Sequence, residues 1–221
     1  MVKDTKENNY KKQERKLSKA EKIRKENFAK YSEEMEKKGY NKREITVGEK
    51  QINVIAALIM LPFVAVFFAI FAVVHDFHIR EIFEATMEEF FLGFILIYVC
   101  IVIHELVHGI TWAINCKKGF KSIAFGVMPE LMTPYCHCCE ALKKVPMILG
   151  IMMPTILLGI IPTIVAILLG NGLLLYVSLF NLVGGGGDFM IFLLVIKDKS
   201  KKETLYYDHP YEPGTVVFEK R

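Results

Sequence analysis

The sequence lacks a disulfide framework. It has five cysteines among 221 residues: Cys100 and Cys116 lie within or at the end of an apolar run, and Cys136, Cys138 and Cys139 fall within four positions. Small secreted proteins that rely on disulfides carry paired cysteines at regular spacing. The pattern excludes that class and predicts reduced thiols. A second zinc site at the clustered cysteines is the alternative, although no second pair of ligands is evident for a closed structural site.

The first fifty residues lack any long apolar run, so the sequence shows no cleavable signal peptide. This segment holds 16 lysine and arginine residues against 10 acidic ones, and its few apolar residues are too sparse for a core. We expect residues 1–50 to form a basic, solvated, partly helical extension, with contact to a partner or to lipid as the alternative. Basic charge beside a membrane helix marks the cytoplasmic side, so it does not imply nucleic-acid binding.

The rest of the chain has little charge over four long stretches, which gives 52% hydrophobic residues and a mean hydropathy of +0.31 in spite of 24% charged residues. The stretches are residues 52–74, 90–116, 147–169 and 173–196. A helix that crosses a bilayer needs ~20 apolar residues. We therefore expect an all-α integral membrane protein with about four transmembrane helices. Prolines and glycines predict bends in the third.

Basic residues alternate between the segments that flank these stretches. There are 16 before the first stretch, one in the first loop, five in the second, none in the third and six after the last. The positive-inside rule then places both termini in the cytoplasm of a multi-pass cell-membrane protein. His75 and His78 fall in the first, outer loop, where we expect them to be solvated.

The segment 119–146 cannot be a simple membrane helix. It contains two glycines and three prolines as well as the clustered cysteines. Irregular backbone at membrane depth is tolerated only where protein or water covers it. We expect an irregular hairpin or a re-entrant segment between the second and third helices.

Three ionisable residues interrupt the second apolar stretch. His104 and His108 are four residues apart, so on a helix both imidazoles reach one metal ion. Glu105 lies about 100° around the helix from His104, where it can take a proton from a zinc-activated water. Such groups cost ~2.5–3.5 kcal/mol per charge within a membrane helix. The alternative reading is a helix end that reaches the polar interface.

A catalytic zinc site needs a third protein ligand. Asp188 is the best candidate, because it is the only ionisable residue in the fourth stretch and follows four glycines. Both His108 and Asp188 lie eight residues before the predicted cytoplasmic end of their helix, so both sit roughly 12 Å inside that boundary. His137, Glu130 and Glu140 are rival ligands, and His137 has a further possible role in contacting substrate or stabilising an oxyanion.

These motifs together resemble a known family. They are HELVHG at 104–109, PYCHC at 134–138, the bent MPTILLGIIP segment at 153–162, GGGGD at 184–188 and DHPxxPG at 208–214. The sequence resembles the small bacterial zincin peptidases, which are similar in plan to site-2 intramembrane zinc proteases. The resemblance implies that His104, His108 and Asp188 bind Zn²⁺ and that Glu105 is the catalytic base. It departs from the site-2 pattern at Phe189, where those proteases usually have glycine after the aspartate.

The sequence thus predicts a membrane-embedded zinc metallopeptidase that hydrolyses peptide bonds through a zinc-activated water. It predicts three regions: the extension 1–50, the membrane-embedded peptidase domain 51–197 and a cytoplasmic tail 198–221. The expected partners are membrane lipid and a peptide or membrane-protein substrate, with no nucleic acid. The alternatives are a non-catalytic metal-binding membrane scaffold and a metal transporter. No inverted repeat supports transport, and a structural site has no need of Glu105.

Overall fold

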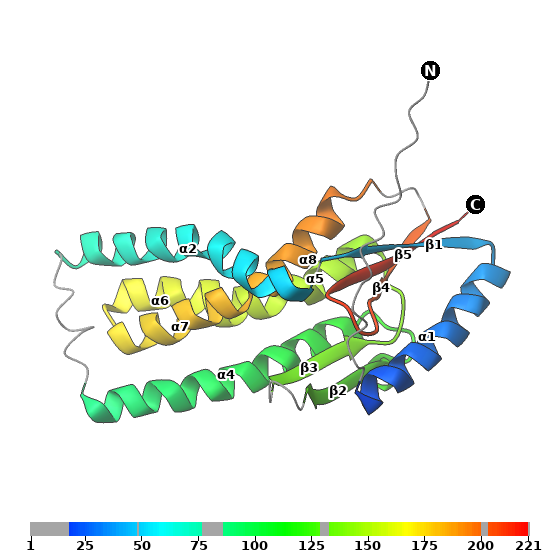
Figure 1. Cartoon of the computed structure of the whole chain (residues 1–221). Coiled ribbons are helices and arrows are strands. Elements are labelled where there is room, and N and C mark those ends of the chain that lie inside the picture. The colour runs from blue at the N-terminus through cyan, green and yellow to red at the C-terminus, as the bar shows by residue number, and fades with distance from the viewer. Residues whose placement is uncertain (1–17, 48, 77–85, 129–132, 200–202, 221) are drawn as a thin grey trace, which may run out of the picture.

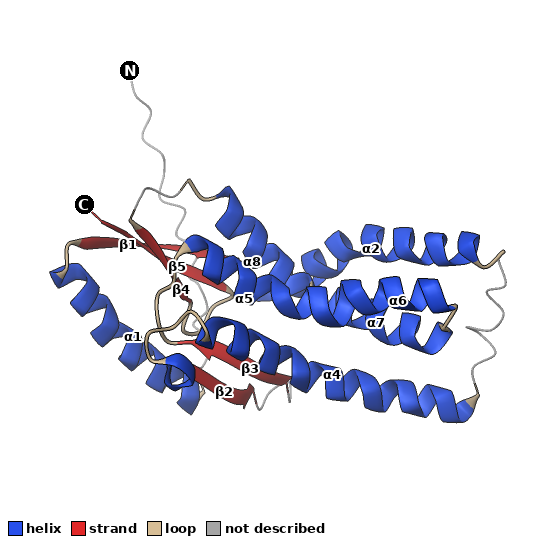
Figure 2. Ribbon diagram, turned by 180° about the vertical axis from the view of Figure 1, so that it is seen from behind, coloured by secondary structure: helices blue, strands red, loops and turns tan. Residues whose placement is uncertain are grey.

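The computed structural model describes residues 18–47, 49–76, 86–128, 133–199 and 203–220, and most of them are helical (Figure 1). The helices are α1 (Lys19–Lys37), α2 (Glu49–Val74), α4 (Met87–Ala113), α5 (Lys144–Pro154), α6 (Ile161–Leu169), α7 (Gly172–Gly184) and α8 (Gly186–Lys197). The strands are β1 (Tyr40–Thr46), β2 (Ile123–Met128), β3 (Thr133–Cys138), β4 (Thr204–Asp208) and β5 (Gly214–Lys220). The helical bundle and the strands occupy opposite ends of the molecule (Figure 2).

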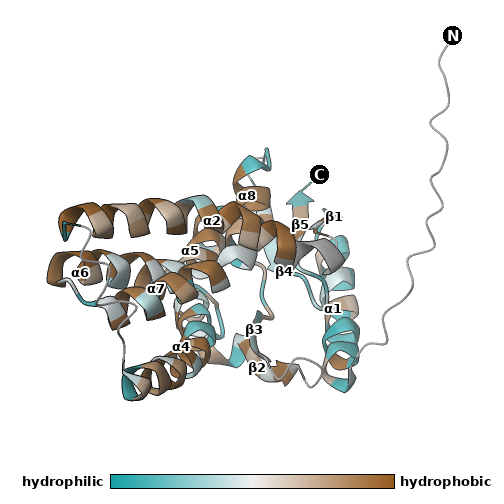
Figure 3. Ribbon diagram, turned by 60° about the vertical axis from the view of Figure 1, so that its left-hand side comes forward, coloured by the Kyte–Doolittle hydropathy of each residue, from teal (hydrophilic) through white to brown (hydrophobic). Residues whose placement is uncertain are grey.

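Three helical segments are long and apolar enough to cross a membrane: Val54–Val74, Met87–Ala113 and Lys144–Leu169. A fourth span results if α7 and α8, which meet at an angle of 46°, are counted together. Many apolar residues of these helices are exposed, and hydrophobic residues predominate along the helices of the bundle (Figure 3). The described part of the chain thus agrees with the predicted number of about four spans.

The fourth span is two helices, whereas the sequence predicts one unbroken helix over 173–196. The break falls at Gly185, within the glycine run. A Cβ on Gly185 would clash with the hydroxyl of Thr155, and one on Gly186 would lie 2.9 Å from the carbonyl oxygen of Ala56. The glycines therefore let α8 begin in close contact with two other helices, as small residues do in membrane proteins.

The third span departs from a regular α-helix in the region where the sequence predicts a bend. Between α5 and α6, residues Thr155–Ile160 form a π-helical stretch. Pro154 ends α5 and Pro162 lies in the first turn of α6, where proline is tolerated because its missing N–H has no partner there in any case. A π-helical stretch is common near functional sites, and this one packs against α7 and lies beside the break at Gly185.

The expectation of an all-α fold is wrong outside the spans. Strands β1, β5 and β4 form an antiparallel sheet in that order, and β2 and β3 form a separate antiparallel hairpin. The first sheet joins both ends of the chain, since Arg43 lies opposite Val217 in its register. Strands from the predicted extension and the predicted tail thus share one sheet, while the division into three regions stays a prediction.

Helix α1 covers one face of this sheet. Ser18 and Glu21 form a reciprocal capping box at its start. Its buried side chains pack on the sheet in a cluster of five buried residues, namely Phe28, Met35, Tyr207, Val216 and Phe218. Helix α1 and the sheet β1-β5-β4 together form the terminal module. The predicted extension therefore has a core after all, because its sparse apolar residues combine with those of the distant C-terminal strands.

The predicted hairpin in 119–146 is present as β2 and β3, which pack along the second half of α4. Gly109 of α4 has no room for a Cβ because the ring of Phe125 lies against it. His75 is not the solvated loop residue that the sequence predicts. Its Nε2 lies 2.8 Å from the carbonyl oxygen of Ile167, and its ring packs in a tilted arrangement against that of Phe71. His78 lies outside the described residues.

Candidate metal centre

Helix α4 brings three possible metal ligands together, as its sequence spacing predicts. One ligand atom each from His104, Glu105 and His108 lies within 4.8 Å of the others. The two imidazole rings are 4.8 Å apart between centroids. The helix starts at a capping box formed by Thr86 and Glu89 and continues without a break to Ala113, so these side chains stand on a regular helical frame.

Asp188 lies in the first turn of α8, and its carboxylate is close to the two histidines of α4. Its Oδ2 atom lies 2.9 Å from Nε2 of His104 and 3.5 Å from Nε2 of His108. The three side chains are largely shielded, with exposures of 14%, 6% and 21% for His104, His108 and Asp188. The break at Gly185 starts a new helix three residues before Asp188, and this sets the direction in which the carboxylate points.

The backbone of α5 fixes the orientation of His108. Its Nδ1 lies 2.7 Å from the carbonyl oxygen of Gly150. A carbonyl oxygen only accepts hydrogen bonds, so Nδ1 must carry a proton. In the neutral imidazole, Nε2 is then the atom with the free lone pair. That atom faces Asp188, so the ring is already in the tautomer that a metal ligand requires.

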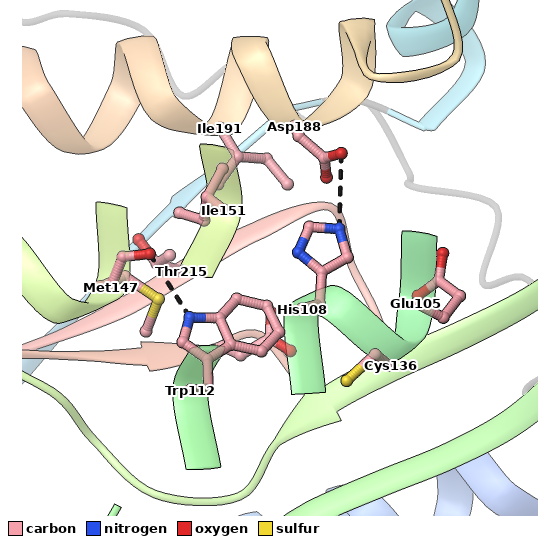
Figure 4. Close-up of a pocket in the computed structure, with 10 residues that line it drawn as sticks. Glu105, His108, Trp112, Cys136, Met147, Ile151, Asp188, Ile191 and Thr215 are labelled. Atoms are coloured by element: carbon pink, nitrogen blue, oxygen red, sulfur yellow. Dashed lines mark hydrogen bonds and ion pairs between the residues drawn. The ribbon is translucent and has the colours of Figure 1, made fainter. Parts of the chain in front are cut away.

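A cavity of about 140 Å³ adjoins these residues. Ten residues line it: Glu105, His108, Trp112, Cys136, Met147, Ile151, Asp188, Ile191, Asp208 and Thr215. Figure 4 shows Asp188 and Glu105 at one side of the cavity, Met147 and Thr215 at the other, and Ile151 and Ile191 between them. The charged residues of the bundle therefore open onto a mainly apolar space, which the terminal module helps to close.

Two imidazoles and a carboxylate are donor types that Zn²⁺ accepts in catalytic sites. Their three atoms converge, so the residues present fit a zinc ion. Residues 97–202 match the model of a family described as "Putative zincin peptidase". This zincin peptidase match covers a little under half of the chain and includes all four predicted site residues. The family implies a metallopeptidase and zinc. No curated protein and no solved structure matches the chain.

Outside the zincin peptidase segment, Asp208 contributes to the site in a way that the sequence did not indicate. It ends β4 and lines the cavity, and its Oδ2 lies 2.8 Å from Nδ1 of His137. Burial would lower the pKa of His137, but the Asp208 carboxylate outweighs burial and raises this pKa to about 9. Among the described residues, the group of candidate ligands on α4 does not include His137, and its Nδ1 is already paired with Asp208.

Another rival ligand, Glu140, has its hydrogen-bond partners in the turn after α4 and not among the histidines. Glu140 accepts hydrogen bonds from the backbone N–H groups of Lys117 and Lys118 and from the hydroxyl of Ser122. Glu140 therefore holds the turn after α4. Glu130 lies outside the described residues.

The clustered cysteines do not form a metal site among the described residues, where the only group of three or more candidate ligands is the one on α4. Cys136 lines the cavity, and its burial, followed by the charges of Asp208 and Glu105, raises the pKa of its thiol. A neutral thiol is a poor zinc ligand. Cys116 and Cys138 lie 3.6 Å apart between sulfur atoms, so these two buried thiols contact each other.

Proposed function

We propose that the chain is a membrane-embedded zinc metallopeptidase in which His104, His108 and Asp188 bind Zn²⁺ and Glu105 transfers protons. The observation that carries the proposal is the position of Asp188 Oδ2, within 3.5 Å of Nε2 of both histidines although it comes from a helix 80 residues further along the chain. The family match supports the reaction class.

When bound, zinc supplies Lewis-acid catalysis at the peptide carbonyl and makes water a nucleophile near neutral pH. Glu105 stands next to His104 and lines the cavity, so it takes the proton from the attacking water and delivers it to the leaving amine. Trp112, Met147, Ile151 and Ile191 supply apolar parts of the cavity lining, and apolar surroundings strengthen the electrostatic interactions around the reacting groups.

The substrate is a peptide or a membrane protein that binds in extended form along the β2–β3 hairpin. In the part of the chain that the structure describes, β3 pairs only with β2, and Cys136 of β3 lines the cavity. The Cys138 N–H on this edge already donates to Asp208 Oδ2, so an extended peptide would pair with the remaining backbone groups of β3. An extended substrate also exposes its peptide bond, whereas a helical one shields it.

The proposed topology is a multi-pass cell-membrane protein with both termini in the cytoplasm. Support comes from the sheet of the terminal module: β1 precedes the first span, β5 follows the last, and the two strands pair over seven residues. Paired strands must lie on the same side of a bilayer, which requires an even number of spans between them. The four-span count satisfies this requirement, and the basic residues at both ends favour the cytoplasmic side.

The test compares purified wild-type protein in detergent with the variants His104→Ala, Asp188→Ala and Glu105→Gln. We expect about one zinc per chain in the wild type and in Glu105→Gln, and ~100-fold weaker zinc binding in the other two, since each loses a ligand. Cleavage of fluorescein-labelled casein should fall in all three variants. Zinc content is measured by plasma emission after chelator-free purification.

Two outcomes separate the proposal from its alternatives. Absence of zinc in the wild type after zinc is resupplied contradicts the metal site itself. Bound zinc with no cleavage that depends on Glu105 favours the non-catalytic metal-binding scaffold, since a structural site does not use that carboxylate.

A further inference from the structure

Trp112 is the only tryptophan of the chain, and it stacks on the candidate ligand His108. The centroids of the two rings are 5.2 Å apart, and the ring planes differ by 14°. Both residues stand on one face of α4, four positions apart, and His104 lies one turn further in the same row. The indole therefore covers the side of the His108 ring that faces away from His104.

The same indole is held by α5. Its Nε1–H donates a 3.4 Å hydrogen bond to the carbonyl oxygen of Met147, one turn before Gly150. A Cβ on Gly150 would clash with Trp112 at Nε1, so only glycine lets the indole lie against this backbone. Trp112 is 5% exposed and belongs to a buried core cluster with Met147 and Ile151.

Two contacts therefore restrain the ring of His108 in different directions. The Gly150 carbonyl fixes the proton and the rotation of the ring through Nδ1 at 2.7 Å. The indole fixes the plane of the ring through the stack. Both depend on the close approach of α5 to α4 at Gly150. Groups that orient a metal-binding histidine in this way affect metal affinity about 10–100-fold.

We propose that Trp112 is a positioning residue for the metal centre, which holds His108 in its metal-binding orientation together with the Gly150 carbonyl. This inference rests on the proposed function, since it takes His108 as a zinc ligand. It assigns to Trp112 a role through His108, with no contact to the metal or to the reacting atoms. It also makes Trp112 an intrinsic fluorescent reporter of metal bound at His108.

The first experiment measures zinc affinity of the full-length protein in detergent by competition with a chromophoric chelator. Trp112→Leu removes the flat ring and should weaken zinc binding about ten-fold or more. Trp112→Phe keeps a stacking ring and should recover most of the affinity. Gly150→Ala should weaken binding as much as Trp112→Leu, whereas Gly184→Ala, where a Cβ meets nothing within 4 Å, should match the wild type.

A destabilised protein could lose zinc without any specific role for Trp112, so a matched core variant is needed. Val217→Ala truncates a fully buried member of the same core cluster that does not line the cavity. It should lower the melting temperature and leave zinc affinity within two-fold of the wild type. If Val217→Ala and Trp112→Leu weaken zinc equally at equal loss of melting temperature, the positioning role is contradicted.

The second experiment uses Co²⁺ in place of zinc and follows tryptophan fluorescence. Co²⁺ should quench the wild-type emission with one metal per chain, and His108→Ala should abolish this tight quenching. Absence of metal binding in the wild type would contradict the proposed function. Zinc affinity that is unchanged in Trp112→Leu in the chelator competition would contradict only the positioning role, so the two failures are distinguishable.

Discussion

The helical bundle and the terminal module use the same apolar residue types in opposite ways. In the bundle, Leu58, Phe91 and Val102 are 59%, 60% and 52% exposed. In the terminal module, Val216, Val217 and Phe218 are fully buried. A soluble protein rarely exposes such a continuous apolar surface. The difference agrees with helices that are apolar enough to cross a membrane and a sheet that is built around its own core.

The candidate metal centre lies where the two regions meet. His108 and Asp188 come from the spans, whereas Asp208 and Thr215 come from the terminal module and line the same cavity. The module is therefore part of the site and not an appendage to it. Matched substitutions in the bundle and in the terminal module should therefore change the stability of the protein by unequal amounts.

The largest expected difference is between Phe218→Ala and Phe91→Ala. Phe218 is fully buried in the core under α1, and its truncation should cost about 3–5 kcal/mol of unfolding free energy. Phe91 is 60% exposed on α4, so its truncation in detergent should cost no more than about 0.5 kcal/mol. Thermal unfolding of the two variants provides the measurement. Equal losses would contradict this difference between the bundle and the terminal module.

An intermediate effect is expected from the ion pair of His137 and Asp208, which joins β3 to the terminal module. The fold raises the pKa of His137 from its ordinary value of 6.5 to about 9. Its stabilisation is therefore complete below pH 6.5 and is lost as the pH rises through about 9. The melting temperature of the wild type should fall between pH 7 and pH 10.

The matched control for this pH dependence is His137→Gln, which keeps a hydrogen-bond donor but cannot carry the charge. Its melting temperature should be lower at pH 7 and should change less between pH 7 and pH 10. An identical pH dependence in both proteins would show that His137 does not titrate with the raised pKa.

The smallest effect is expected at the surface contacts of Arg43. Its guanidinium lies 2.6 Å from Asp198, just after α8, and 2.8 Å from Glu219 of β5. The arginine side chain is 40% exposed, and exposed ion pairs contribute about 0–1 kcal/mol. Arg43→Ala should lower the unfolding free energy within that range, and salt should reduce the difference. A larger loss, insensitive to salt, would mean that this contact holds the module to the bundle.

The spans and the α4 motif are predictable from the sequence because both depend on local patterns. An uncharged run of sufficient length defines a span, and the four-residue spacing of His104 and His108 places both on one helical face. Asp188 is predictable as a partner of His108 because both lie equally far from the predicted cytoplasmic ends of their helices. Helices rise by a constant amount per residue, so the two side chains lie at the same depth. The structure places Asp188 beside both histidines, while its role as a ligand stays a proposal.

The terminal module is not predictable in this way. Strand β1 has the sequence YNKREIT, which shows no apolar run, and its partner β5 lies more than 160 residues further along the chain. Asp208 reaches the cavity only because that long-range pairing exists. The positions of Gly150 and Trp112 are likewise set by the close approach of two helices, which depends on three-dimensional packing and not on spacing along one helix.

The pairing of β1 with β5 also determines when the protein becomes complete during its synthesis. Strand β1 leaves the ribosome early, but it must wait for β5, whose last paired residue is Lys220. Until then the cavity lacks Thr215, and the apolar residues on α1 have no sheet to cover. A chain that is truncated before β5 would therefore carry the α4 motif and Asp188 without a finished pocket, so the cavity beside the candidate metal centre forms only after β5 has been made.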